Sequence, residues 1–262
     1  MGLTTLGVIG GTGWLGGALL RPALAKGFVA AADLILSSRS GNTAGFEAWP
    51  DIRFTTDNRS LAAQSDIVIL SVRPKDLDAL DLDLSGKLVI SVMARVPAEA
   101  LLARFNSERI IRAMPNACAE QGLSFTPWLS TPETTTADAD FADSFFACSG
   151  KTTRLSTESE LDYFTALTGS GPAFIAAFAD AMIRDAIANG VAPDVADTAV
   201  RQLFLGSGTW MADALETPAD TVRVFTDYGG TTAAGLVAML SAGIAGPISK
   251  GLVAARDKAA KG

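Results

Sequence analysis

The stretch Leu6-Gly-Val-Ile-Gly-Gly-Thr-Gly-Trp-Leu-Gly16, near the start of the chain, decides the fold. Leu6–Gly10 is a short apolar run ending in glycine, and apolar residues then recur from Trp14 towards Gly27 with the 3.6-residue period of a helix. Gly11, Gly13 and Gly16 form a G-x-G-x-x-G motif between the two elements. A strand, a glycine-rich turn and a helix are predicted, and in this context the motif indicates a dinucleotide pyrophosphate site. An ordinary glycine-rich turn is the alternative.

Further along the chain, short apolar runs alternate with helical patterns, which is typical of a parallel sheet with helices on both faces. The strands are expected at 33–38, 52–55, 67–72, 87–92 and 109–113, and a loop over 130–140 leads to a helix near 137–147 and a last strand at 151–155. Alanine-rich helical stretches dominate afterwards. We therefore expect an α/β fold, with a Rossmann-type doubly wound sheet over residues 1–154 and an all-α domain over residues 155–262.

Composition excludes several classes of protein. The 262 residues carry a formal net charge of −7, which disfavours nucleic acid and anionic membrane surfaces as partners. The chain has no histidine, so histidine triads, histidine metal sites and dehydrogenases with a histidine proton shuttle are all excluded. Cys118 and Cys148 have no metal-ligand spacing. We expect no metal, and a reducing, cytoplasmic location.

Two uncharged stretches, 1–20 and 228–249, have the length of membrane segments. The first lacks a basic leader, and both are rich in glycine. We expect no membrane partner, and interpret 228–249 as helices buried on all sides, as at the core of a dimer.

The end of the second strand indicates which cofactor is used. A fold selective for NAD places an acid there, whereas this chain has Ser37-Ser38-Arg39-Ser40. Arg39 offers a planar fork to a 2′-phosphate. NADP(H) is therefore preferred, with NAD(H) as the second option, and a solvated surface arginine is the alternative interpretation of Arg39.

Three stretches occur in the order and spacing of one enzyme family: Arg112-Ala-Met-Pro-Asn116, Thr168-Gly-Ser-Gly-Pro-Ala173 and Gly229-Gly-Thr-Thr232. Asp57-Asn58, Ser71-Val-Arg-Pro74 and Ser91-Val-Met-Ala94 fit the same pattern. Over its whole length the chain resembles the pyrroline-5-carboxylate reductases. The resemblance implies NAD(P)H-dependent reduction of a cyclic imine, foremost 1-pyrroline-5-carboxylate to proline, by hydride transfer to the C=N carbon. It also implies that the helical domain binds substrate and forms a homodimer or a larger homo-oligomer.

The motif and the resemblance together assign residues to two groups. The cofactor-binding residues are Gly11, Thr12, Gly13, Trp14, Leu15, Gly16, Ser38, Arg39, Asn58, Val72, Arg73, Pro74, Met93, Ala94 and Asn116. The substrate-binding residues, expected to hold the carboxylate, are Ser170, Gly171, Gly230, Thr231 and Thr232. A glycine pair followed by threonines and an apolar helix also describes a helix N-terminus able to bind a carboxylate, although an ordinary capped helix explains it as well.

The expected chemistry requires little of the protein. A protonated imine is already electrophilic, so reduction requires positioning and electrostatics rather than a strong acid. We expect Thr232 to hydrogen-bond the ring nitrogen. Asp180 is a supporting candidate, with an i,i+4 ion pair to Arg184 as the alternative.

Three other functions remain open or are disfavoured. A β-hydroxyacid dehydrogenase relies on a lysine in the first long helix after the sheet, and 156–201 contains none. The second alternative is a non-catalytic NADP-binding regulatory protein. The third is a reductase of a different cyclic imino acid, because the chain departs from the family pattern at Arg95, Ala117-Cys118, Phe174 and Tyr228.

Overall fold

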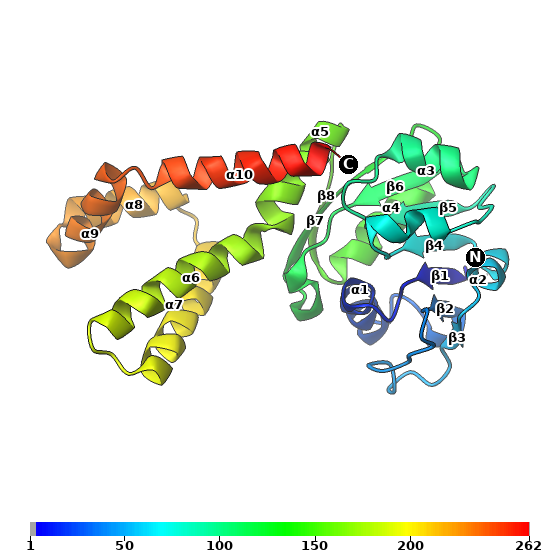
Figure 1. Ribbon diagram of the computed structural model, residues 1–262, viewed down its shortest axis with the longest axis horizontal. Helices are drawn as coiled ribbons and strands as arrows, with labels where there is room; N and C mark the ends of the chain where they lie inside the picture. The colour runs from blue at the N-terminus through cyan, green and yellow to red at the C-terminus, as the bar shows by residue number, and fades with distance from the viewer. Residues whose placement is uncertain (1–3, 262) are drawn as a thin grey trace. The chain divides into compact units, whose positions relative to one another are not determined.

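The computed structural model describes residues 4–261, which form an eight-stranded sheet followed by helices (Figure 1). The strands are β1 (Leu6–Ile9), β2 (Leu34–Ser37), β3 (Arg53–Thr55), β4 (Ile67–Leu70), β5 (Leu88–Ser91), β6 (Ile110–Ala113), β7 (Ser124–Ser130) and β8 (Gly150–Arg154). The α-helices are α1 (Trp14–Ala25), α2 (Asn58–Gln64), α3 (Ala98–Phe105), α4 (Thr136–Ala147), α5 (Glu158–Phe164), α6 (Gly171–Ala188), α7 (Pro193–Asp213), α8 (Pro218–Tyr228), α9 (Gly230–Ser241) and α10 (Ala245–Ala260). Three 3₁₀ turns, η1 (Ala31–Asp33), η2 (Pro74–Ala79) and η3 (Ala117–Gln121), and a π-helical turn, η4 (Thr165–Gly169), complete the described chain.

The strand order is β3-β2-β1-β4-β5-β6-β7-β8, with β1 to β6 all parallel. The chain runs outward from β1 through β2 to β3 and then returns to place β4 on the other side of β1. This reversal is the topological switch point, and ligands of doubly wound sheets bind outside the carboxyl ends of the strands there. The predicted Rossmann-type sheet is confirmed.

Alternate residues of the strands pack on opposite faces of the sheet. Leu34 and Leu36 join one core cluster, which includes side chains of α1 and α4, whereas Ile35 joins the other, with side chains of α2 and α3. Because both faces are covered, β1, β2, β4, β5 and β6 are buried along their whole length. This two-sided burial explains why their sequences are nearly continuous apolar runs.

The far edge of the sheet differs from the prediction. The sequence indicated no strand at β7, and β7 runs antiparallel to β6 while pairing in parallel with β8. Pro127 lies inside β7 and weakens the strand signal. The predicted loop over 130–140 is also too long, because β7 extends to Ser130 and α4 begins at Thr136.

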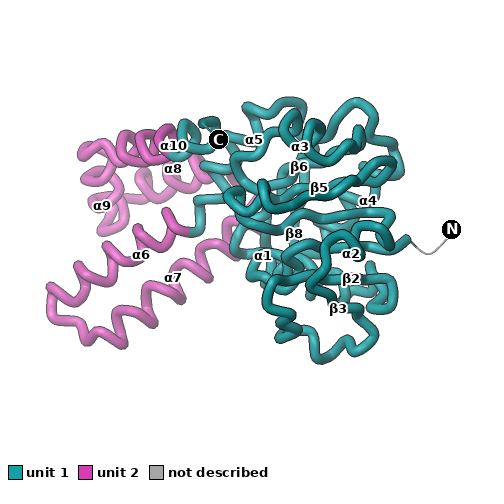
Figure 2. Tube along the Cα trace, turned by 45° about the vertical axis from the view of Figure 1, so that its right-hand side comes forward, with its two compact units in different colours: residues 1–172, 255–262 teal, residues 173–254 magenta. Residues whose placement is uncertain are grey.

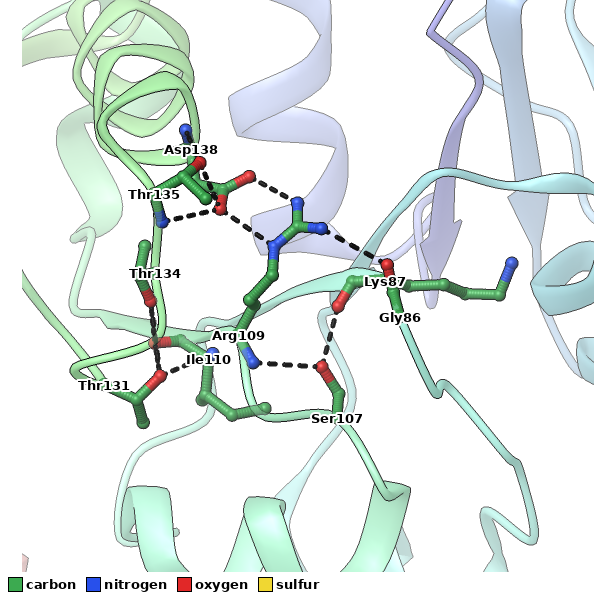
Figure 3. Close-up of polar contacts among 9 residues, drawn as sticks. All are labelled: Gly86, Lys87, Ser107, Arg109, Ile110, Thr131, Thr134, Thr135 and Asp138. Carbon is green, nitrogen blue, oxygen red and sulfur yellow. Dashed lines mark hydrogen bonds and ion pairs between the residues drawn. The ribbon is translucent and has the colours of Figure 1, made fainter.

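A polar network fixes the start of α4 against this part of the sheet (Figure 3). Asp138 accepts hydrogen bonds from Arg109 Nε at 2.9 Å and Nη2 at 2.6 Å, and from the Thr135 hydroxyl at 2.8 Å. Arg109 Nη1 donates to the carbonyl of Gly86 at 3.2 Å. Burial alone would raise the pKa of Asp138, but the hydrogen bonds from Arg109 and Thr135 outweigh it and lower the pKa. The carboxylate therefore stays ionised although its side chain is only 7% exposed.

The described chain divides into two compact units, residues 1–172 with 255–262 and residues 173–254 (Figure 2). The second unit is helical, and among its residues only Ala196 and Val200 are buried. Large apolar side chains lie exposed on it, including Leu205, Trp210 and Val224. The predicted boundary between the two domains, after residue 154, does not coincide with this division into compact units, and it stays a prediction.

By length and composition alone, the helical stretch Glu158–Ala188 could span a membrane, as could α9 and α10 taken together as a bent pair. The pair overlaps the uncharged stretch 228–249. The other stretch, 1–20, contains β1 and the start of α1, and its residues 1–3 lie outside the described residues. The absence of a membrane partner stays a prediction.

Candidate active site

A pocket of about 570 Å³ lies at the carboxyl ends of β1, β2 and β4, at the switch point. Seven of the predicted cofactor residues line it: Thr12, Gly13, Ser38, Arg39, Asn58, Val72 and Arg73. Ten lining residues were not predicted: Ile9, Gly10, Ser37, Ser40, Asn42, Thr56, Ser71, Asp76, Ala79 and Leu80. Four of these directly neighbour a predicted residue along the chain, namely Gly10, Ser37, Ser40 and Ser71.

The glycine turn at the pocket is shaped by two residues. Gly10, outside the predicted motif, has φ +80°, and a Cβ on it would lie 2.4 Å from the carbonyl oxygen of Ser71. A Cβ on Gly16 would lie 2.7 Å from the Gly10 carbonyl oxygen, so only glycine lets α1 start this close to the turn. Gly11, to which the motif assigns the tight turn, instead lies against Leu36, 2.8 Å from where its Cβ would be. The left-handed residue of the turn is therefore Gly10.

The N-terminus of α1 opens at the pocket without a side-chain cap. Gly13 is the N-cap residue, with φ −70° and ψ 167°, and no side chain bonds the amides of the first turn. Those amides carry the positive end of the helix dipole. The turn and the helix start therefore form a cradle that fits a pyrophosphate.

The end of β2 carries polar groups suited to the ribose beside the adenine. Ser37 is buried and its hydroxyl donates to Asn58 Oδ1 at 2.6 Å, which leaves the Asn58 amide donors for a ligand. Ser38 and Arg39 follow, and Arg39 is exposed. No acid stands at the end of β2, so the residues fit a cofactor with a 2′-phosphate.

Two arginines in this pocket share one carboxylate. Arg73 Nε donates to Asp76 Oδ2 at 3.0 Å, and Arg39 Nη1 lies 3.6 Å from Asp76 Oδ1. The hydrogen bond from Arg73, helped by the charges of Arg73, Arg39 and Lys75, lowers the pKa of Asp76. The carboxylate is therefore ionised at neutral pH.

The remaining predicted cofactor residues do not line the pocket: Gly11, Trp14, Leu15, Gly16, Pro74, Met93, Ala94 and Asn116. Met93 is buried, and the side chain of Asn116 accepts a hydrogen bond from the Cys118 amide at 2.9 Å, which caps η3. Their assignment to the cofactor stays a prediction.

An ion pair between the buried Arg112 and the partly exposed Glu158 joins the stretch 112–116 to the start of α5. Arg112 Nη1 donates to Glu158 Oε2, while Glu158 Oε1 accepts from the amide of Ala98 at 2.9 Å. Burial lowers the pKa of Arg112 to about 10, opposed by the charge of Asp162. Glu158 thus joins β6, α3 and α5, a role that no sequence pattern indicated.

The comparisons with known proteins agree with this geometry. A model of the pyrroline-5-carboxylate reductase dimerisation family matches residues 158–262, and one of the coenzyme F420-dependent NADP oxidoreductase family matches residues 5–95. A pyrroline-5-carboxylate reductase of Vibrio alginolyticus is 34% identical over 194 residues, 71% of each chain. The chain belongs to the pyrroline-5-carboxylate reductase family. Another member, from Synechocystis, is 29% identical over 95% of each chain.

The fold of the family is also shared. The pyrroline carboxylate reductase of Plasmodium falciparum, solved with NADP bound, superposes with a TM-score of 0.85 at 23% identity, covering 98% of this chain and 97% of that chain. The predicted fold and family are confirmed. The prediction of an NADP-dependent oxidoreductase agrees with the family matched over residues 5–95.

The residues that the family resemblance assigns to the substrate occur in two places. Ser170 and Gly171 belong to the first compact unit, directly after η4, and the Ser170 amide donates to the Thr165 carbonyl at 2.9 Å. Gly230, Thr231 and Thr232 begin α9 in the second unit, and both threonines are exposed. No side chain caps α9, so its first-turn amides remain for a ligand carboxylate.

In the single chain Asp180 forms the i,i+4 ion pair with Arg184 that the sequence offered as the alternative to an active-site role. Its carboxylate pairs with Arg184 at 2.8 Å, four residues along α6, and both side chains are exposed. Tyr228, one of the departures from the family pattern, ends α8 beside Gly229 and is 89% exposed. It is available to contact a substrate at the start of α9.

Proposed function

We propose that this protein reduces 1-pyrroline-5-carboxylate to proline with NADPH. The observation that carries the proposal is the glycine-turn pocket at the switch point, with Arg39 where NAD-selective folds place an acid, in a chain of the pyrroline-5-carboxylate reductase family. NADH is the second cofactor in this proposal.

The residues of the pocket bind the charged groups of the cofactor. Thr12, Gly13 and the amides at the start of α1 take the pyrophosphate, and Ser38 and Arg39 take the 2′-phosphate. Asn58 presents its amide to the adenosine ribose. When bound, the reduced nicotinamide supplies the hydride that the C=N carbon accepts.

The substrate is held and polarised by neutral groups in this proposal. The first turn of α9, which no side chain caps, binds the carboxylate, and Thr232 hydrogen-bonds the ring nitrogen. The assignment of Ser170 and Gly171 to the substrate stays a prediction. The imine carries its own positive charge when protonated, so no protein acid is required and a histidine-free chain suffices. The proton on the product amine exchanges with solvent.

The assembly is proposed to be a cytoplasmic homodimer or a larger homo-oligomer. The match to a dimerisation family over 158–262 supports self-association. The exposed apolar side chains of the second unit support it too, because monomers rarely expose large contiguous apolar surface. Cys118 and Cys148 are both free thiols, in keeping with a reducing compartment.

The proposal is tested by following NADPH and NADH oxidation against a panel of five- and six-membered cyclic imino acids. Turnover is expected first with 1-pyrroline-5-carboxylate, and with NADPH favoured. Fastest turnover of a six-membered imine would transfer the proposal to a different cyclic imino acid, the alternative that the departures from the family pattern leave open. NADPH binding without any turnover would favour a regulatory protein.

The role of Thr232 has its own test. Thr232→Ala is expected to lower kcat about 100-fold by removing a hydrogen bond at the reacting nitrogen, with the KM for NADPH unchanged. Thr209→Ala is the matched control, because the Thr209 hydroxyl bonds the Leu205 carbonyl within α7, outside both sites. An unchanged kcat in Thr232→Ala would remove Thr232 from the mechanism.

A further inference from the structure

Asp76 lies where neither the glycine motif nor the family pattern places a functional residue. It belongs to η2, the 3₁₀ turn that begins at Pro74 just after β4, and it lines the pocket at the switch point. Its side chain is 24% exposed, less than the side chains of Arg39 and Arg73 that face it. The carboxylate is therefore less accessible to water than the two arginines with which it pairs.

The two arginines reach Asp76 from opposite sides of the glycine turn. Arg39 follows β2 and Arg73 follows β4, and these strands flank β1. Arg73 is engaged by a direct hydrogen bond of 3.0 Å, whereas Arg39 is held only loosely at 3.6 Å. Arg39 is thus the partner that a second anion can take from Asp76.

We propose that Asp76 sets the selectivity between the two nicotinamide dinucleotides, by competing with the 2′-phosphate for Arg39. This proposal rests on the proposed function in one respect only, namely that the cofactor is a nicotinamide dinucleotide. A dinucleotide with a free 2′-hydroxyl meets no such competition, so its binding is insensitive to the charge of Asp76. The carboxylate restrains the preference for NADP(H) and keeps NAD(H) usable. In NAD-selective folds an acid at the end of the second strand contacts the ribose, whereas here an acid enters the same pocket from the end of β4.

The test isolates one phosphate by calorimetric titration of the full-length protein with adenosine 2′,5′-bisphosphate and with adenosine 5′-monophosphate. Asp76→Asn keeps the size of the side chain and removes its charge. It is expected to tighten the bisphosphate about threefold to fivefold, as for an exposed charge pair, with the monophosphate changed by less than about twofold. Asp76→Glu restores the charge and is expected to return the ratio of the two affinities towards the wild-type value.

Two controls separate competition from other effects. Asp78→Asn makes the same charge change in the same turn, but Asp78 does not line the pocket and is expected to leave both affinities unchanged. Arg39→Gln removes the group for which the two anions compete. Adding Asp76→Asn to Arg39→Gln is then expected to improve the bisphosphate by less than twofold.

Weaker bisphosphate binding by Asp76→Asn would overturn the proposal, since Asp76 would then be positioning Arg73 for the phosphate. Equal changes for both nucleotides, or the same gain from Asp78→Asn, would overturn it as well. A wild-type protein that binds neither nucleotide would contradict both this proposal and the proposed function. Selective tightening in a protein that reduces no cyclic imine would support Asp76 as the selector and remove only the proposed reaction.

Discussion

Two aspartates of this chain are paired with arginine in different surroundings. Asp138 is 7% exposed and is bound by Arg109 through two hydrogen bonds of 2.6 and 2.9 Å, in the network of Figure 3. Asp76 is 24% exposed and lies 3.0 Å from one arginine and 3.6 Å from another. The first, which we call the closed pair, stabilises the start of α4. The second, which we call the open group, has arginine donors left for a ligand. Access to water, rather than the residue types, distinguishes the structural pair from the candidate binding group.

Breaking the closed pair is expected to have the largest effect. Arg109→Ala leaves the buried Asp138 carboxylate without its two-pronged partner, which lowers the free energy of unfolding by about 3 kcal/mol. Urea unfolding followed by tryptophan fluorescence measures it, because Trp128 is buried and donates to Asp143 of α4 at 2.8 Å. The matched control is Arg59→Ala, which breaks the exposed pair with Asp81 and should change stability by less than about 1 kcal/mol. Equal losses in the two variants would refute the distinction.

Breaking the open group is expected to affect binding rather than stability. Arg39→Gln should weaken NADPH about tenfold by removing a charge-assisted contact to the 2′-phosphate, with NADH changed by less than about twofold. Its free energy of unfolding should stay within about 0.5 kcal/mol of wild type, because the Arg39 side chain is exposed. Fluorescence titration and urea unfolding on one preparation measure both quantities. A comparable loss for NADH would show that Arg39 does not read the 2′-phosphate.

The pH dependence of stability is a third property that distinguishes the closed pair. The pKa of Asp138 is lowered in the folded state, so its contribution to stability is fully present above the unfolded pKa near 3.9 and is lost as the pH falls through the folded pKa. The stability difference between wild type and Asp138→Asn should therefore be constant from about pH 5 to pH 7 and narrow below about pH 4. Denaturant unfolding at several pH values measures it. A difference that persists unchanged to pH 3 would mean that the charge of Asp138 contributes nothing.

The smallest effect is expected at Asp180. Asp180→Asn breaks an exposed i,i+4 pair with Arg184, so the free energy of unfolding should change by only about 0.4 kcal/mol. A loss above about 1 kcal/mol would place Asp180 in a buried contact of the assembly. A fall in kcat without a change in stability would support its catalytic assignment.

The parallel part of the sheet could be predicted because its strands are buried on both faces and read as apolar runs between glycine turns. β7 could not, because Pro127 interrupts it and its antiparallel pairing with β6 lies outside the alternation of parallel strands and helices. One signal was available. Only ten residues separate Ala113 from Ser124, too few for the helical crossover that a parallel neighbour requires.

Residues of the candidate site could be predicted from the sequence where their residue type has one dominant role in that context. Gly13 and Arg39 follow strands in a recognisable context, and both line the pocket. Gly10 and Asp76 were missed because their roles depend on proximity that the sequence does not state, namely the contact of Gly10 with Ser71 and the turn that brings Asp76 to Arg39. Glu158 reads as an ordinary acid in the first turn of a helix, and only the fold shows that it meets Arg112.

The exposure of Trp14 has a consequence for the fluorescence of the protein. It directly follows Gly13 of the pocket and its side chain is 68% exposed, whereas the side chain of Trp128 is fully enclosed beneath α4. An indole in water emits at longer wavelength than one shielded by protein. The chain has four tryptophans, and Trp210 is exposed as well. In a variant with Trp49 and Trp210 replaced by phenylalanine, the red side of the emission reports the mouth of the pocket and the blue side reports β7. Ligand binding and edge unfolding can thus be followed in one cuvette, without a label and without turnover.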